Sequence, residues 1–232
     1  MIFKQLFDTD TSTYTYLLAC EQTKKSILID TVASQLENYI QLLDNLKLTL
    51  TFTLETHVHA DHVTAASLLR DTLDSKSVVH RDAGAMCADL LVTDNIELQV
   101  GSLLIKVLHT PGHTSGCVSY VVGDRVFTGD SLLINGCGRT DFQQGDSSTL
   151  YHSVHNKLFT LADDTLVYPG HDYNGHRVSS IAQEKALNSR LSLDKSESDF
   201  VNIMQNLNLA YPKYIDEALP ANQACGSLTR QG

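Results

Sequence analysis

The sequence has no long apolar run, no recognisable linker and no internal repeat. A membrane-spanning helix needs about 20 mostly apolar residues, so none is expected. The N-terminus carries one lysine and no apolar segment, and therefore lacks the pattern of a signal peptide. A chain of 232 residues without a stretch rich in proline, glycine and serine is expected to form a single domain, 1–232. We therefore expect a soluble, cytoplasmic protein with no membrane partner.

Positive charge is scarce. Lysine and arginine total 17 residues against 27 aspartates and glutamates, which gives a net charge of −10. This balance argues against binding to nucleic acid or to an anionic membrane surface. It also repels any anionic substrate, so that local arginines would have to attract such a substrate to its site.

Cysteine is also sparse, with five residues and no CxxC pair. The odd number favours free thiols in a reducing compartment over a framework of disulfides. Most of these residues are interpreted as small buried side chains. Cys137 could be a nucleophile or a redox sensor, but no base is adjacent to it, so a packing role in a glycine-rich turn is favoured.

Apolar periodicity and turn residues predict a mixed αβ chain. Gly123-Asp124 is expected to turn between two strands, and Asp146 is expected to cap a helix. The predicted strands are 14–20, 26–30, 49–55, 77–80, 96–100, 103–109, 117–122, 125–128 and 165–168. The predicted helices are 34–46, 63–73, 147–159, 178–187 and 197–206.

Three histidines and one aspartate fall within six residues, in His57-Val58-His59-Ala60-Asp61-His62. They follow a predicted strand, in which positions i and i+2 share a face, so His57 and His59 point the same way. The chain then turns and brings Asp61 and His62 towards the same pocket. Because neutral imidazole is the commonest metal ligand, this cluster predicts a metal site rather than a polar surface loop.

Three further segments place a potential ligand after a predicted strand, next to a glycine that lets the backbone turn sharply. They contain His113 in Thr110–Thr114, Asp130 in Thr128–Asp130 and His171 in Tyr168–His171. A lone histidine at a strand end is more often structural, but four such segments predict ligands delivered by several loops to one edge of a sheet core. The remaining histidines lack this context and are interpreted as surface or packing residues: His80, His109, His152, His155 and His176.

The order HxHxDH, PGHT, GD and GH resembles the metallo-β-lactamase superfamily over residues 1 to about 175. This resemblance implies an α+β fold, the αββα sandwich, with the metal site on one edge. It leaves a short C-terminal helical extension, at about 176–232. Periodicity alone does not distinguish this sandwich from other mixed folds.

Further segments are similar to one family within the superfamily, the persulfide dioxygenases. Only about sixty residues follow His171, which leaves little room for the larger helical domain of many glyoxalase II enzymes. The segments that carry the resemblance are 136–145, 150–155, 171–173, 206–209 and 220–222.

The resemblance implies one Fe(II) per chain, held by His57, His113 and Asp130 as a facial triad with three open positions. It implies the oxidation of glutathione persulfide by O₂ and water to glutathione and sulfite. Four other residues would either be hydrogen-bonded around this iron or build a second metal site: His59, Asp61, His62 and His171. A homodimer is a further expectation from the family.

Arg139 is the predicted clamp for a substrate carboxylate, because a planar guanidinium binds a carboxylate through two hydrogen bonds. A structural ion pair with Asp141 is the alternative, and the two interpretations are about equally favoured. Tyr173 could hydrogen-bond the glutathione backbone, with Arg177 nearby in sequence.

Two other functions remain open. The first is a dinuclear zinc thioester hydrolase of the glyoxalase II type, in which a bridging hydroxide attacks the thioester carbonyl. The second is a non-catalytic binding protein on the same fold. The segment 136–145 and the short C-terminal region favour the dioxygenase over the hydrolase, and the complete ligand set argues against the binding protein.

Overall fold

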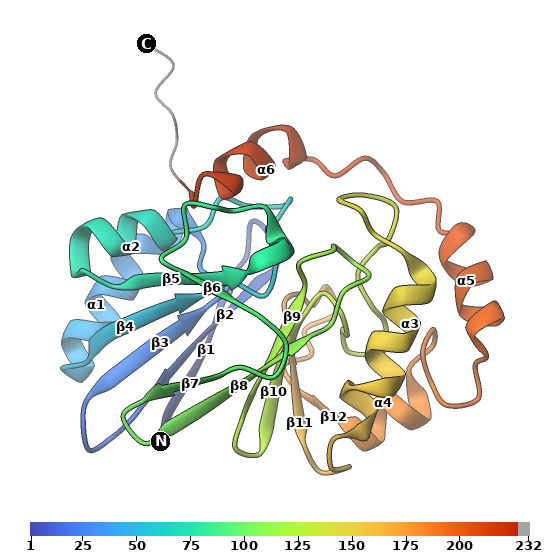
Figure 1. The fold of residues 1–232 in the computed structure, drawn as a ribbon, viewed down its shortest axis with the longest axis horizontal. Helices are drawn as coiled ribbons and strands as arrows, with labels where there is room; N and C mark the ends of the chain where they lie inside the picture. The colour runs from blue at the N-terminus through green and yellow to red at the C-terminus, as the bar shows by residue number, and fades with distance from the viewer. Residues whose placement is uncertain (227–232) are drawn as a thin grey trace.

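The computed structural model describes residues 1–226, which form a sandwich of two six-stranded sheets (Figure 1). The first sheet has the order β1 (Ile2–Asp8), β2 (Thr13–Ala19), β3 (Lys25–Ile29), β4 (Thr49–Leu54), β5 (Lys76–His80), β6 (Leu90–Val92). The second has the order β12 (Ser179–Ser180), β11 (Leu166–Pro169), β10 (Arg125–Gly129), β9 (Val118–Val122), β8 (Leu103–His109), β7 (Glu97–Val100).

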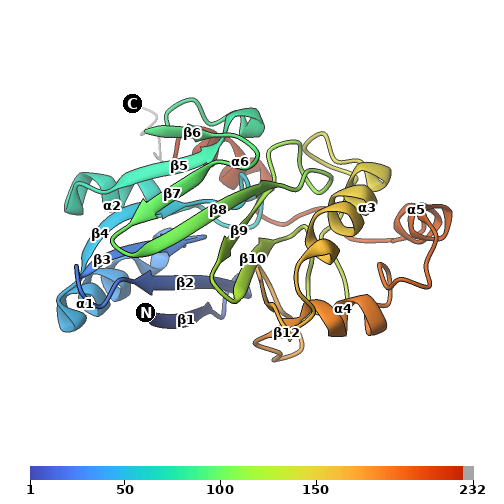
Figure 2. The ribbon, with the colours of Figure 1, turned by 60° about the horizontal axis from the view of Figure 1, so that its bottom comes forward.

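Helices cover the outer faces of both sheets (Figures 1 and 2). The first sheet is flanked by α1 (Leu36–Leu46) and α2 (Ala66–Leu73). The second is flanked by α3 (Ser147–Asn156), α4 (Ile181–Leu187) and α5 (Glu197–Gln205). The last helix, α6 (Ile215–Gln223), returns to the first sheet beside α2 (Figure 1). The expected α+β sandwich of the metallo-β-lactamase type is confirmed.

The hydrophobic core has three layers, one between the two sheets and one between each sheet and its outer helices, and β2 contributes to two of them. All seven of its residues are buried. Tyr16 and Leu18 point between the sheets, whereas Leu17 points outwards and packs with Tyr39 and Leu43 of α1. The strand β2 lies between β1 and β3, so one of its faces packs against the second sheet and the other against α1.

Most predicted elements are present within a few residues of their expected ends, and the Asp146 carboxylate caps α3 by accepting from the Thr149 amide. Four strands or α-helices were not predicted, and the shortest, β12, has only two residues at the start of the predicted helix 178–187. The strand β1 is a half-exposed edge strand and β6 has only three residues, so neither shows a clear pattern. The helix α6 contains Pro220, a residue that normally ends a helix. The expected C-terminal extension contains α4, α5 and α6, and its residues 227–232 lie outside the described part.

The expectation that the cysteines are free thiols is wrong for two of them. Cys87 and Cys225 form a disulfide, with Cα atoms 6.0 Å apart and a sequence separation of 138. The fold brings the segment before β6 against the end of α6, and a separation of this length gives no signal in a single sequence. Cys20, Cys117 and Cys137 are free and buried, as expected.

Within residues 1–226, no helix combines the length and the apolar character that crossing a lipid bilayer requires.

Candidate metal centre

Four strand ends meet at one edge of the sandwich. In the second sheet, β9 is antiparallel to both β8 and β10, and β11 is parallel to β10, so β8, β10 and β11 all end on the same side. They are followed by His113, Asp130 and His171. In the first sheet, β4 ends at Leu54 and runs into the HxHxDH segment. The residues predicted as ligands are thus brought together from several loops.

His57, His113 and Asp130 form one group, in which a potential ligand atom of each lies within 4.8 Å of the others. Nδ1 of His113 donates to the carbonyl of Arg139 at 2.6 Å, which leaves Nε2 free, 3.7 Å from Oδ2 of Asp130. Burial, together with the neighbouring His59 and His113, lowers the pKa of His57 well below its usual value. His57 is therefore neutral, the form that binds a metal.

His59, Asp61 and His62 form a second group beside the first. The His59 and His62 rings are 4.3 Å apart, and Nδ1 of His62 donates to Oδ2 of Asp61 at 2.8 Å. His171 connects the groups, because its Nε2 lies 3.5 Å from Asp61 and 3.7 Å from Asp130. Burial would raise the pKa of Asp61, but the positive potential of His62 and His171 lowers it well below its usual value.

Three buried atoms of these groups have no hydrogen-bond partner within residues 1–226: Nδ1 of His59, Nε2 of His62 and Oδ1 of Asp130. A buried polar atom without a partner costs free energy and calls for an explanation. Oδ1 of Asp130 belongs to the first group, and the two histidine nitrogens belong to the second. Each group brings imidazole nitrogen and carboxylate oxygen within 4.8 Å of one another, a donor set that fits a metal cation.

Two buried carboxylates behind the histidines escaped sequence analysis. Nε2 of His59 lies 3.2 Å from both Asp30 and Glu55. Burial would lower the pKa of His59, but these carboxylates raise it well above its usual value. Asp30 also accepts from the Thr56 hydroxyl at 2.9 Å, whose oxygen is 3.0 Å from Nδ1 of His57. Asp30 follows β3 directly and has a left-handed backbone conformation, with φ 53°. The sequence alone does not reveal this conformation.

Two of the predicted glycines allow a close approach of the strand ends. Gly129 has a φ of 50°, and a Cβ atom there would lie 2.3 Å from the Thr56 hydroxyl. A Cβ atom on Gly170 would lie 2.8 Å from Oδ1 of Asp130. Any larger residue at Gly170 would displace the carboxylate from its place between His113 and His171.

A cavity of about 640 Å³ opens over the metal-binding side chains. Arg139 and Tyr173, the predicted substrate residues, both line it. The Arg139 guanidinium forms two hydrogen bonds with Asp141, at 2.6 and 2.8 Å, and donates to the Ala210 carbonyl at 2.8 Å. The ion pair with Asp141, which was the alternative interpretation of Arg139, is thus present.

The outer part of the cavity is exposed. Tyr173 is 73% exposed, and its ring is parallel to that of His171, 6.1 Å away. Arg190 and Lys213 also line the cavity, and neither has a carboxylate within 4.0 Å in the described part of the chain. Arg177 does not line this cavity; its carbonyl accepts a hydrogen bond from Gln5.

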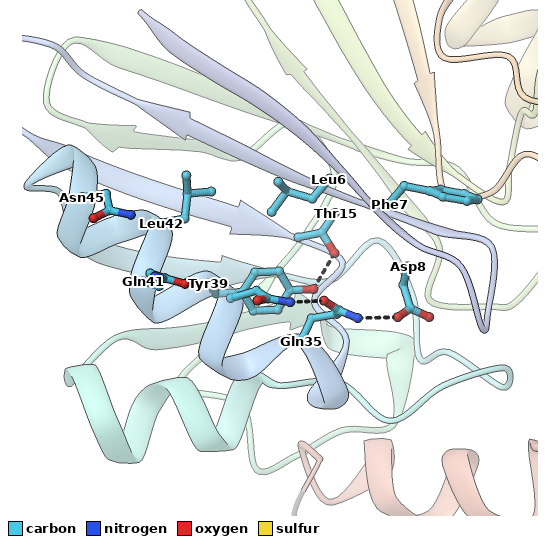
Figure 3. Close-up of a pocket in the computed structure, with 10 residues that line it drawn as sticks. Leu6, Phe7, Asp8, Thr15, Gln35, Tyr39, Gln41, Leu42 and Asn45 are labelled. Carbon is cyan, nitrogen blue, oxygen red and sulfur yellow. Dashed lines mark hydrogen bonds between the residues drawn. The ribbon is translucent and has the colours of Figure 1, made fainter.

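A second cavity, of about 380 Å³, lies between β1 and α1, and no histidine lines it (Figure 3). Its polar lining consists mainly of amides and hydroxyls, and its hydrogen bonds are internal. Thr15 and Tyr39 lie 2.9 Å apart through their hydroxyls, and Gln35 donates to Asp8 at 2.7 Å (Figure 3). This cavity lacks the donor set of a catalytic centre.

His80 and His109 come close to each other, and with Asp82 they bring potential ligand atoms within 4.8 Å of one another. Their rings stack 3.9 Å apart, at an angle of 14°, near Asp82. Parallel rings direct their nitrogen lone pairs side by side rather than towards a common point. Nε2 of His109 also lies 2.9 Å from the Ser115 carbonyl, to which it can donate. Their interpretation as packing residues agrees with this geometry.

The metallo-β-lactamase superfamily model matches residues 8–171. The human mitochondrial persulfide dioxygenase ETHE1 is 47% identical over 232 residues, which cover 99% of this chain and 90% of that protein. The crystal structure of ETHE1 from Myxococcus xanthus superposes with a TM-score of 0.96 at 53% identity, and the match covers 98% of this chain and 100% of that one.

A hydrolase matches over a shorter length. Hydroxyacylglutathione hydrolase of Dictyostelium discoideum is 34% identical over 170 residues, which cover 69% of this chain and 62% of that protein. The match to the hydrolase thus leaves out a third of each protein, whereas the matches to the two ETHE1 proteins extend over almost all of this chain.

Proposed function

The chain belongs to the metallo-β-lactamase superfamily and, within it, to the persulfide dioxygenases, and from this premise we propose that it oxidises glutathione persulfide at a single Fe(II). The balanced reaction converts glutathione persulfide, O₂ and water into glutathione, sulfite and two protons. The S–S bond breaks, the outer sulfur is oxidised and O₂ is reduced. The observation that carries this proposal is the 47% identity with the human persulfide dioxygenase over nearly the whole of both chains.

His57, His113 and Asp130 would hold the iron. Their hydrogen bonds prepare them for this role, because the Arg139 carbonyl fixes the tautomer of His113 and Thr56 faces Nδ1 of His57. Such bonds orient metal ligands and raise their basicity. Iron(II), when bound, supplies the redox chemistry with O₂ that Zn²⁺ lacks.

His59, Asp61, His62 and His171 would surround this site: His59 and His62 are buried, and Asp61 and His171 line the cavity. One nitrogen of His59 faces Asp30 and Glu55, and one nitrogen of His62 is bonded to Asp61, so each ring is fixed in place. A second metal at these residues is the arrangement that a dinuclear hydrolase would need. The lower identity with the hydrolase, 34% against 47% with human ETHE1, supports the single-iron assignment.

The substrate would enter with its persulfide towards Asp130 and its glutathione part towards Arg139 and Tyr173. Three of the five guanidinium N–H groups of Arg139 are used by Asp141 and Ala210, so two remain for a substrate carboxylate. Arg190 and Lys213 supply the positive charge that the Arg139–Asp141 pair cancels. These local cations counter the repulsion that the net charge of −10 exerts on an anion.

The test is to purify the protein without oxygen, count its metal and follow O₂ consumption with glutathione persulfide. The proposal expects about one iron per chain and O₂ uptake that matches sulfite formation. Two zinc ions per chain, with thioester hydrolysis and no O₂ uptake, would establish the glyoxalase II type of reaction instead. The same solution can be examined by light scattering to test the expected homodimer.

A further inference from the structure

Asn222 on α6 uses its side-chain amide to hold the backbone of the HxHxDH segment. Its Nδ2 donates to the His59 carbonyl at 2.8 Å and to the His62 carbonyl at 2.7 Å. Its Oδ1 accepts from the Thr64 amide at 2.9 Å. The side chain is 4% exposed, so these three bonds do not compete with bulk water.

The segment that Asn222 holds has no helix or strand of its own. Residues 59–64 lie between β4 and α2, where no neighbouring strand pairs with the backbone. Buried carbonyls in such a segment need a donor from elsewhere. The two carbonyls bracket Asp61, so the bonds from Asn222 fix the turn that places Asp61 and His62 beside His59.

The end of α6 is fastened at three more points, one of which is on the same segment. The Cys225 carbonyl accepts from the Ser67 amide at 3.1 Å, and Cys225 is joined to Cys87. Gly226 packs so closely that a Cβ atom there would lie 2.3 Å from the Thr64 carbonyl. Asn222 is therefore presented from a helix that is itself fixed in place.

We propose that Asn222 is a positioning residue for the metal centre, acting through the backbone of residues 59–64 and not by touching metal or substrate. This inference rests on the proposed metal site. It assigns to a residue about 160 positions downstream the task of keeping the histidines and Asp61 in the geometry that binds the ion.

The experiment uses Co(II) as a spectroscopic probe on metal-free full-length protein. Asn222→Ala removes all three bonds, and Asn222→Asp keeps the acceptor for Thr64 but places a carboxylate against two carbonyls. Both variants should bind Co(II) about ten- to a hundredfold more weakly than the wild type, with a changed ligand-field spectrum. Without metal, the amides of residues 59–64 should exchange hydrogen faster.

Asn188→Ala is the matched control. Asn188 is also a buried asparagine with several hydrogen bonds, donating to Gly136 and Glu184, but it does not contact the HxHxDH segment. This variant should lower the melting temperature and leave the Co(II) affinity unchanged. The comparison separates positioning of the site from a general loss of stability.

The inference fails if both Asn222 variants are folded and bind Co(II) with the affinity and spectrum of the wild type. It also fails if Asn188→Ala weakens Co(II) binding as much as Asn222→Ala does. If the His113→Ala variant binds Co(II) with the affinity of the wild type, the proposed metal site is refuted, and the inference fails with it.

Discussion

The two ends of the active-site cavity are built differently. At the metal end, His57, His59 and His171 are at most 3% exposed, and each ring has a polar partner that fixes one of its nitrogens. At the substrate end, Tyr173 is 73% exposed. Under the proposed function, the chemistry would depend on the buried junction of two sheets, whereas selection of the thiol would depend on a surface that can change without disturbing that junction.

The largest effect should come from removing a ligand at the metal end. We expect His113→Ala to abolish iron retention, because the ring supplies one of only three protein donors. Metal analysis after anaerobic purification measures this loss, and circular dichroism confirms that the variant is folded. If this variant retains as much iron as the wild type, His113 is not a ligand and the metal end has been assigned wrongly.

A milder change at the metal end is Gly170→Ala. The added methyl group would lie 2.8 Å from Oδ1 of Asp130 and would push the carboxylate away from His113. We expect an iron affinity about ten- to a hundredfold lower, the range seen when the surroundings of a ligand are altered. A competition titration with a chelator measures the affinity. Unchanged affinity would mean that the site tolerates movement and is less rigid than its burial indicates.

At the substrate end, Arg139→Ala should weaken substrate binding and leave iron in place. The loss of a charge-assisted hydrogen bond of about 1.5–3 kcal/mol predicts a KM raised roughly ten- to a hundredfold. The carbonyl of residue 139 still accepts from His113 in this variant. Steady-state O₂ uptake gives KM and kcat separately, and a loss of iron would contradict the substrate role.

The smallest effect concerns His80, a buried histidine outside the metal centre. Burial and the neighbouring His109 lower the pKa of His80 from 6.5 to about 4. Between these values the unfolded chain binds a proton at His80 that the folded chain does not. Stability is therefore full above pH 6.5 and falls as the pH drops towards 4, by at most about 1.4 kcal/mol per pH unit.

His80→Gln should flatten this pH dependence, as measured by urea unfolding at several pH values on metal-free and iron-loaded protein. Iron should leave the His80 contribution unchanged, because this residue is not part of the metal end. If the contribution disappears when iron is added, the His80–His109 pair is coupled to the metal centre.

The metal end could be predicted from the sequence because its ligands follow strand ends and carry glycines beside them. His57 and His59 share a face by strand geometry alone, and Gly129 and Gly170 mark the points of close approach. The residues behind the ligands could not be predicted. Asp30, Glu55 and Asn222 reach the histidines through contacts that depend on how the sheets and α6 pack.

The substrate end was predicted less well for a physical reason. From the sequence, Arg139 could either bind a substrate carboxylate or form an ion pair with Asp141. The structure shows the ion pair, which is compatible with binding of a substrate carboxylate. Exposed side chains such as Tyr173 have few contacts that fix them, so neither periodicity nor burial indicates their task. The disulfide was missed because two distant cysteines carry no spacing signal.

The bond between Cys87 and Cys225 also closes the polypeptide into a ring. His113, Asp130 and His171 lie inside that ring, on the arc of chain between Cys87 and Cys225. A protease that cuts one peptide bond in the arc would open the ring without separating the pieces. Such nicked protein would migrate as one species on a gel without reductant and as two once thiol is added.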